Sequence, residues 1–324
     1  ILDGLGVRWF WPGEVGEHVP ARPSIYIPDL DRAFEPGFSR RHIWAPDTRL
    51  PKDLRAEYND WQRRNRMPGH LTGSMGHAYN RIVKASDAEL FAQHPEYFAQ
   101  VDGKRVMNAQ ICTTNPDVIQ RAIAYAREYF AHNPGDQMVS MSPSDGGGFC
   151  ECEVCRAQGS ISDNAVIFAN HVARDLQTSC PGKYVAMYAY SGTAPPPTVD
   201  CEPNLIIWIA TSFITGGFTL DELLAGWSQK ARQLGIRDYY SIGSWTWQMP
   251  QYDPEGKLKQ LVYYRTRKVV GVLAEAEDNF GAVGPDYYVA ARLMYDPAQS
   301  LEDLLADYYD KCWGQAAEPM RRYW

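Results

Sequence analysis

Eight short apolar runs that alternate with helical patterns constrain the fold of this chain more than any other feature of its sequence. They predict strands at residues 41–44, 69–79, 109–112, 138–142, 184–190, 205–210, 239–245 and 269–275. Continuous apolar runs are typical of parallel strands, which are buried on both faces of their sheet. Eight strand-then-helix units predict an α/β protein with a (β/α)8 TIM-like barrel. An open doubly wound sheet is the alternative, but no Gly-x-Gly-x-x-Gly motif follows the first run to favour it.

The segments between the runs carry helix start signals. Asn115–Pro116 and Asp253–Pro254 each pair an N-cap residue with a proline at the first helical position. An apolar stripe at helical spacing runs through residues 163–176. Strands and helices therefore alternate along most of the chain, as a barrel requires.

Composition and charge exclude several classes of function. Of the 324 residues, 45% are hydrophobic and 22% charged, and the net charge is −7. This is the composition of a globular chain, and no run of lysine and arginine predicts a nucleic-acid-binding face. No apolar run reaches the roughly 18 residues that a membrane span needs. The chain starts without Met and ends in a helical pattern, so we expect a piece of a longer protein, in which missing targeting signals carry no information.

The polar residues that follow the predicted strands are the candidates for function, because a barrel places its active site at the carboxyl ends of its strands. Asp145 follows the fourth run and Glu275 ends the eighth. Paired carboxylates at such positions are what glycoside hydrolysis requires, and we predict these two as the catalytic residues. The predicted substrate-binding residues are His77, Tyr190, Trp245, Trp247, Asn279 and Trp44. Aromatic rings suit the faces of sugars, and histidine or asparagine can hold sugar hydroxyl groups.

Each acid also has a structural alternative. An aspartate that follows a strand commonly caps the next helix, which is the alternative for Asp145. Glu277 and Asp278 are predicted to form a solvated turn. A barrel that keeps the aromatic residues but lacks a working acid pair would be a non-catalytic carbohydrate-binding protein.

The stretch "SPSDGGGFCECEVCR", residues 142–156, adds three cysteines to the loop after the fourth run. Cys150, Cys152 and Cys155 lie there, and Cys112 ends the neighbouring third run. Four cysteines could hold a structural zinc ion, two could form a disulfide within the cluster, or all could be free thiols. A zinc ion held by four cysteines has no open position, so such an ion would not be catalytic. We expect no cofactor for catalysis. A zinc-ribbon interaction protein fits neither the length of the α/β pattern nor the acidic charge.

Six blocks of the sequence resemble a known family. They are "LGVRWFWPGEVGEHVP", "HPEYFAQVDGKR", "ICTTNPDV", "SPSDGGGFCECEVC", "AEAEDNFGAVGPDYYVAARLMYDP" and "YYDKCWGQAAEPMRRYW". In this order they resemble the successive blocks of the family catalogued as domain of unknown function 4838. Some of its members were reclassified as glycoside hydrolase family 163, which comprises endo-β-N-acetylglucosaminidases acting on complex N-glycans.

The resemblance implies a (β/α)8 catalytic domain preceded by a small α/β domain. Residues 1–35 are then the junction from that domain, and residues 36–324 the barrel. Asp145 and Glu275 fall where the family keeps acids, and His77, Tyr190 and Asn279 fall on sugar-contact positions.

The implied function is a bacterial glycosidase that cleaves an N-acetylglucosaminide-type linkage in an oligosaccharide or glycoprotein glycan. The hypothesis is a substrate-assisted retaining mechanism, with Glu275 as general acid/base and Asp145 as the orienting carboxylate, although the two roles could be exchanged. An α-glucuronidase-like or other exo-glycosidase is the alternative enzyme. We expect a secreted, periplasmic or cell-surface location, no nucleic-acid partner, and no membrane span within this chain.

Overall fold

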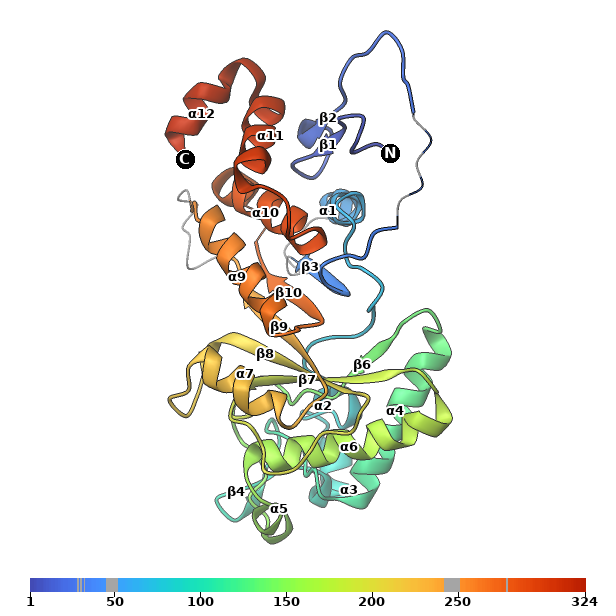
Figure 1. The fold of residues 1–324 in the computed structure, drawn as a ribbon. Coiled ribbons are helices and arrows are strands. Elements are labelled where there is room, and N and C mark those ends of the chain that lie inside the picture. Colours follow the sequence, from blue (N-terminus) through green and yellow to red (C-terminus); the bar gives the residue numbers. More distant parts are fainter. Residues whose placement is uncertain (28, 30, 32, 45–51, 242–250, 278) are drawn as a thin grey trace. The chain divides into compact units, whose positions relative to one another are not determined.

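The computed structural model describes residues 1–324 except 28, 30, 32, 45–51, 242–250 and 278 (Figure 1). The chain divides into two compact units. The first unit comprises residues 1–69 and 238–324, and the second comprises residues 70–237. The first unit is therefore discontinuous in sequence, whereas the second is one uninterrupted segment.

Six of the strands form a parallel sheet. Its strands are β3 (Arg40–Trp44), β6 (Met138–Ser140), β7 (Tyr184–Ser191), β8 (Leu205–Ile214), β9 (Gln233–Tyr239) and β10 (Gly271–Glu275). The hydrogen-bonding order is β3-β10-β9-β8-β7-β6, and β9 runs through the boundary between the two units. In the second unit β6, β7, β8 and β9 pair in parallel, and in the first unit β10 pairs in parallel with β3.

The central strands of the second unit's sheet are buried because their middle sections consist almost entirely of apolar residues. Residues 185–189 of β7 and 205–210 of β8 are buried throughout. Helix α6 (Ile161–Ser179) packs on β7, and α4 (Pro116–His132) packs on α6 and β6 (Figure 1). The predicted stripe of α6 is confirmed, and Asn115 caps α4 by accepting hydrogen bonds from the amides of Asp117 and Val118. Burial on both faces explains why these strands lack an alternating pattern.

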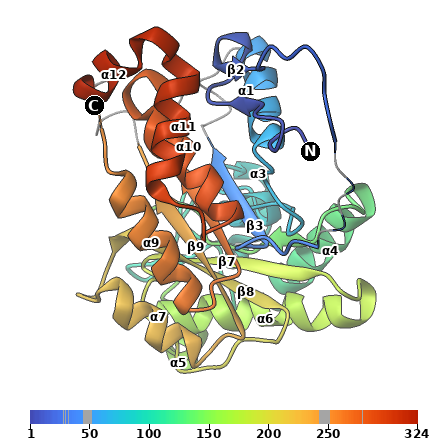
Figure 2. The same cartoon turned by 45° about the horizontal axis from the view of Figure 1, so that its top comes forward.

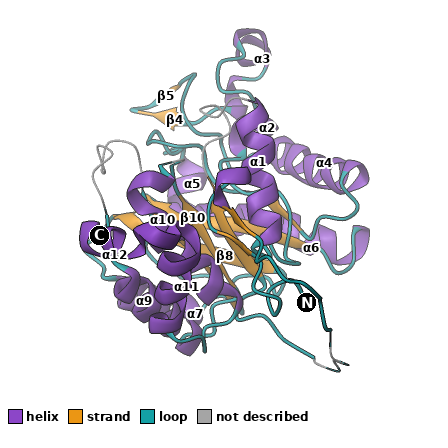
Figure 3. Ribbon diagram, turned by 90° about the horizontal axis from the view of Figure 1, so that it is seen from above, coloured by secondary structure: helices purple, strands orange, loops and turns teal. Residues whose placement is uncertain are grey.

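Shorter elements complete the second unit. They are α2 (Tyr79–Ile82), α3 (Ala88–Gln93), η2 (Pro95–Tyr97), β4 (Gln100–Val101), β5 (Lys104–Arg105), α5 (Glu153–Gln158) and α7 (Leu220–Ser228). Strands β4 and β5 form a small antiparallel hairpin (Figure 3).

The second and third predicted strands are replaced by isolated bridges. Gly73 and His77 bridge Met138 and Ser142 in parallel, so this segment runs beside β6 without forming a regular strand. Gly73 has φ +138°, and a Cβ there would lie 2.0 Å from the Met138 carbonyl oxygen. Only glycine allows so close a backbone approach. The third predicted strand contributes one antiparallel bridge, between Ile111 and Phe98.

The first unit is mainly helical outside β3 and β10. Its elements are β1 (Arg8–Trp9), η1 (Glu14–Gly16), β2 (Glu17–His18), α1 (Lys52–Arg64), α9 (Pro254–Thr266), α10 (Phe280–Tyr295), α11 (Leu301–Trp313), η3 (Gly314–Ala316) and α12 (Ala317–Tyr323). Helix α10 is buried at most of its positions and contacts α9, α11 and β3 (Figure 2). A helix that is apolar on most sides is the expected centre of a core.

The two ends of the chain meet within the first unit. Asp3 accepts two hydrogen bonds from Arg292, at 2.6 and 2.9 Å, and also pairs with Arg8 and Arg66. Burial opposes the charge on this carboxylate, but Arg292 and its neighbours lower the pKa of Asp3 to about 2. Trp11 donates a hydrogen bond to Tyr308 over 3.0 Å.

The α/β class and the parallel sheet are confirmed, but the described residues give six strands of the expected eight, and a closed barrel is not confirmed. The seventh predicted strand, residues 239–245, was misplaced along the sequence, because β9 ends at Tyr239, where the predicted strand begins. The predicted division at residue 35 stays a prediction. No helix in the described part of the chain is both long enough and apolar enough for a membrane span.

Candidate functional site

Asp145 lies on an exposed loop that a buried glutamine holds in place. Gln110, 2% exposed, donates from Nε2 to the Ser144 carbonyl over 2.8 Å and accepts from the Ser144 amide over 2.9 Å. The side-chain amide thus acts on Ser144 as a neighbouring strand would. The loop leaves β6 through Ser142, whose hydroxyl accepts a hydrogen bond from the Tyr188 amide. The residue before the predicted acid therefore has a defined backbone position.

Three residues predicted for the site gather in the second unit. Tyr190, near the end of β7, donates a hydrogen bond to Asp145 Oδ1 over 3.2 Å. The His77 ring lies 6.1 Å from the Tyr190 ring, centroid to centroid, and its Nδ1 is 2.6 Å from the Pro143 carbonyl oxygen. Because a carbonyl can only accept, Nδ1 carries a proton and donates it to this hydrogen bond. A carboxylate, a phenol and an imidazole beside one another can bind several hydroxyl groups of a sugar.

Two residues near Tyr190 have left-handed backbone conformations. Ser191 has φ 49° and Phe213 has φ 59°. The ladder between β7 and β8 shifts register at this point, and the Phe213 ring lies 5.7 Å from the Tyr190 ring. Such conformations are costly for residues other than glycine and gather at functional sites. Phe213 was not predicted, because the apolar run of β8 ends before it.

Glu275 ends β10 in the first unit, between the ends of two other strands. It pairs with Trp44 of β3, whose carbonyl accepts from the Ala276 amide over 2.9 Å. The Glu275 carbonyl accepts from the Tyr240 amide over 2.8 Å. The backbone on either side of this acid is thus fixed, and its side chain is partly exposed.

Ser241 and Tyr287, both buried, form a hydrogen-bonded network with residues that follow Glu275. Ser241 and Tyr287 lie 2.5 Å apart through their hydroxyl oxygens, and both reach Asn279 Oδ1, at 3.2 and 3.4 Å. The Glu277 amide donates to both hydroxyls, at 3.1 and 3.2 Å. Glu277 is 8% exposed, so the prediction of a solvated turn was wrong for this residue. The side-chain oxygen of Asn279, Oδ1, therefore already has two hydrogen-bond partners inside the protein, Ser241 and Tyr287.

Asp286 of α10 is a further acid that the sequence pattern did not indicate. It is 5% exposed and accepts from the Asp253 amide at both oxygens, over 3.0 and 3.1 Å. Burial raises the pKa of Asp286 to about 6, against the opposing effects of the Asp253 amide and Lys257. Its hydrogen bonds hold the start of α9, which is a structural role.

Two predicted residues, Trp245 and Trp247, lie outside the described residues. Asp145 belongs to the second unit and Glu275 to the first. Their joint action on one substrate therefore stays a prediction.

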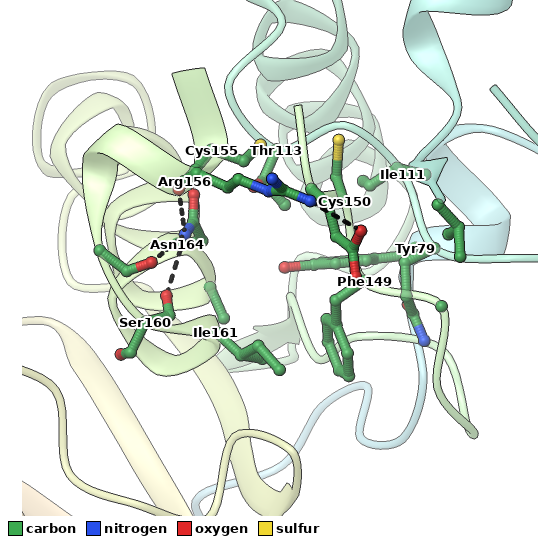
Figure 4. A pocket seen from close by; sticks show the side chains of 16 residues that line it. Tyr79, Ile111, Thr113, Phe149, Cys150, Cys155, Arg156, Ser160, Ile161 and Asn164 are labelled. Atoms are coloured by element: carbon green, nitrogen blue, oxygen red, sulfur yellow. Dashed lines mark hydrogen bonds and ion pairs between the residues drawn. The ribbon is translucent and has the colours of Figure 1, made fainter. Parts of the chain in front are cut away.

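A pocket of about 480 Å³ opens in the second unit beside the loop after β6 (Figure 4). Tyr79, Phe149 and Ile161 supply apolar surface, and Asn164 supplies an amide. Asn164 Nδ2 donates to the carbonyls of Cys155, Gly159 and Ser160. Burial raises the pKa of Tyr79 above its ordinary value, so its phenol is neutral.

Four cysteines meet next to this pocket. The Sγ atoms of Cys112, Cys150, Cys152 and Cys155 all lie within 4.8 Å of one another. Cys112 Sγ is 3.8 Å from Cys152 Sγ and 4.0 Å from Cys155 Sγ. Hydrogen bonds from Cys150 and Cys155 lower the pKa of Cys112 below that of an ordinary thiol. The predicted convergence of the four cysteines is present.

Comparison with known proteins gives one family and a structural relative. The model of the family described as "Domain of unknown function (DUF4838)" matches residues 11–324. No curated protein matches the chain. A solved structure, described as that of a "GH138 enzyme targeting pectin rhamnogalacturonan II", is similar, with a TM-score of 0.51 and 10% identity. The similarity covers 90% of this chain and 44% of that protein, so the chain spans less than half of its structural relative.

Proposed function

Because the chain belongs to the family described as domain of unknown function (DUF4838), and its fold resembles that of a glycoside hydrolase, we propose that it is a glycosidase. One observation carries the proposal: Asp145 and Glu275 each lie where a parallel strand ends, Asp145 after β6 and Glu275 at the end of β10. Enzymes built on parallel α/β sheets carry their reactive groups at these ends.

The proposed chemistry uses the two carboxyl groups in different roles. Glu275 donates its proton to the glycosidic oxygen as the bond to the anomeric carbon breaks. For an N-acetylglucosaminide, the carbonyl oxygen of the substrate's own 2-acetamido group attacks the anomeric carbon, and Asp145 orients that amide. Water then opens the cyclic intermediate, losing its proton to Glu275, and the sugar is released with its original anomeric configuration.

The surroundings of Asp145 support a role in substrate binding. Tyr190 fixes one carboxylate oxygen, and the His77 ring lies against Tyr190. The exposed Phe213 ring lies against Tyr190 and offers an apolar face of the kind on which sugar rings stack. Trp44, the partner of Glu275 in the ladder, is the corresponding aromatic residue of the first unit.

A second candidate substrate is an acidic plant polysaccharide. It is favoured by the structural similarity to an enzyme that targets pectin rhamnogalacturonan II. A glucuronosyl oligosaccharide belongs to the same chemical class, and in neither case is there a 2-acetamido group to act as nucleophile. In that case Asp145 itself would act as the nucleophile or as a general base.

A hydrolysis screen tests these proposals. The full chain is incubated with complex N-glycans, β-N-acetylglucosaminides, α-glucuronosyl xylo-oligosaccharides and rhamnogalacturonan II, and products are identified by mass spectrometry. Glu275→Gln and Asp145→Asn are the test variants. Glu318→Gln and Asp200→Asn, which change exposed acids of the same two units, are the controls.

Product from the wild type and both controls, with a loss of at least about 100-fold in each test variant, supports the proposal. Wild-type activity in Glu275→Gln or Asp145→Asn would remove that residue from its role. If calorimetry detected glycan binding but no substrate gave a product, the proposed glycosidase activity would be overturned, and a carbohydrate-binding protein would be favoured. The extracytoplasmic location stays a prediction.

A further inference from the structure

We propose that Cys112, Cys150, Cys152 and Cys155 form a structural zinc site in the second unit. The site is separate from the proposed glycosidase chemistry and does not depend on it. The geometry, the groups around the sulfur atoms and the local chain path each support it.

The sulfur separations match a single tetrahedral ion. Zinc–sulfur bonds of about 2.3 Å place the corners of a tetrahedron about 3.8 Å apart. Cys112 Sγ lies 3.8 Å from Cys152 Sγ and 4.0 Å from Cys155 Sγ, and no pair in the group exceeds 4.8 Å. A disulfide would bring two of these atoms to about 2.05 Å. An iron–sulfur cluster would spread them farther apart, because its cysteines bind different iron atoms.

Hydrogen-bond donors surround the sulfur atoms. The Gln100 amide donates to Cys150 Sγ over 3.4 Å, and Arg105 Nη1 lies 3.5 Å from the same atom. The Thr114 hydroxyl is 3.2 Å from Cys155 Sγ and 3.5 Å from Cys112 Sγ. Four thiolates and one Zn²⁺ carry a net charge of −2, which amide, hydroxyl and guanidinium donors stabilise. Arg105 is held in place by a hydrogen bond to the Phe98 carbonyl.

The burial pattern favours ligands over ordinary core cysteines. Cys112, Cys152 and Cys155 are 3%, 8% and 1% exposed, and they form a core cluster that contains only cysteines, with Cys150 packed against it. An isolated buried cysteine packs as a small apolar residue among other apolar residues. Four sulfur atoms gathered away from such residues form a soft, closed ligand set that selects zinc over calcium or magnesium.

The site explains how a short loop holds its conformation. Cys150 and Cys152 follow the glycine-rich segment after β6, Cys152 is the N-cap of α5, and Cys155 lies within this six-residue helix. Cys112 lies two residues beyond Gln110, which clamps Ser144. The ion therefore ties the outgoing end of the Asp145 loop to the segment that fixes its beginning. With all four positions filled by thiolates, the ion has no open position for catalysis.

Metal analysis of the full chain tests the site. We expect about one zinc per chain after purification and desalting, and release of that zinc when the thiols are modified with a mercurial. Exchange with Co²⁺ should give an intense thiolate-to-cobalt absorption and the visible bands of a tetrahedral ion. Cys155→Ser should lose at least about 90% of the zinc, whereas the control Cys180→Ser should retain it.

If Cys155→Ser does not fold, Cys150→Ser replaces it, because Cys150 is only partly buried. This variant should bind zinc more weakly, and its cobalt complex should show a weaker charge-transfer band. Stoichiometric iron in the wild type would overturn the proposal. So would metal-free protein whose thiols all react, or an intact mass two hydrogens below that of the thiol form.

Discussion

Tyr190 donates a hydrogen bond from its phenol to Asp145 Oδ1 over 3.2 Å, joining the end of β7 to the loop after β6. The Asp145 side chain also accepts a hydrogen bond from the Gly146 amide, over 3.0 Å to the same oxygen. These contacts restrict the orientation of an otherwise exposed carboxylate. If Asp145 orients the substrate, its rotamer matters more than its burial, and Tyr190 is the residue that positions it.

Tyr190→Phe should lower kcat about 10-fold on whichever glycoside the wild type hydrolyses, because a hydrogen bond to a charged group is lost. The rate is measured at saturating substrate, and KM separately. Tyr184→Phe, at the other end of the same strand, is the control and should retain wild-type kcat. An unchanged kcat in Tyr190→Phe would show that the phenol does not position the acid.

Gly235 of β9 lies opposite Trp208 of β8, which is fully buried. A Cβ at residue 235 would approach the Trp208 ring to 2.4 Å. Gly235→Ala should therefore lower the free energy of unfolding by about 1–3 kcal/mol, since the indole must move within a packed core. Urea unfolding measures the change. Gly135→Ala, whose added Cβ meets open space, should stay within about 0.5 kcal/mol of the wild type.

The strands that the sequence predicts well are those with uninterrupted apolar runs. Residues 184–190 and 205–210 correspond to β7 and to the first part of β8. The β9 strand was misplaced because Arg237 and Asp238, 7% and 3% exposed, lie within it and break its apolar pattern. The glycines that let residues 73–77 run beside β6 likewise remove the strand pattern.

The candidate site divides in the same way. Asp145, Tyr190 and His77 could be predicted together because each follows or accompanies a predicted strand. Gln110 and Phe213 could not, because their roles depend on tertiary contacts with no spacing in the sequence. The cysteine cluster falls between these cases. Spacing indicates three of its members, and only the order of the chain segments indicates the fourth.

Asp163 joins the start of α6 to the segment before β8. Its carboxylate accepts from the amide and hydroxyl of Ser160, over 2.9 and 2.7 Å, and from those of Thr198, over 2.6 and 2.8 Å. Burial raises the pKa of Asp163, but the hydrogen bonds from Ser160 and Thr198 outweigh it and lower the pKa below its usual range. A lowered folded pKa contributes stability above the unfolded value of about 3.9, and this stability is lost as the pH falls through the folded value.

Asp163→Asn should therefore destabilise the protein by about 2–4 kcal/mol at pH 7, because an amide group would face these donors. The difference in unfolding free energy between Asp163→Asn and the wild type should become smaller below about pH 4. Thermal unfolding at pH 7, 4 and 3 measures this. Glu222→Gln, which changes the matching position in the exposed capping box of α7, is the control and should show a smaller loss. If the variant and the wild type differed in stability by the same amount at all three pH values, the lowered pKa of Asp163 would be contradicted.

Asp286 should show the opposite dependence on pH. Its folded pKa, raised by burial to about 6, lies above the unfolded value, so the folded state binds a proton more tightly. The resulting stability is fully present below about pH 4 and is lost as the pH rises through about 6.

The side chain of Asn in the variant Asp286→Asn is uncharged throughout, and its carbonyl can still accept from the Asp253 amide. Asp286→Asn should therefore be more stable than the wild type at pH 7.5, by at most about 3 kcal/mol, and lose this advantage at pH 4. Urea unfolding at both pH values measures the difference, with Asp29→Asn, an exposed acid, as control. A variant that loses stability between pH 4 and 7.5 as steeply as the wild type would show that the wild-type loss comes from other groups.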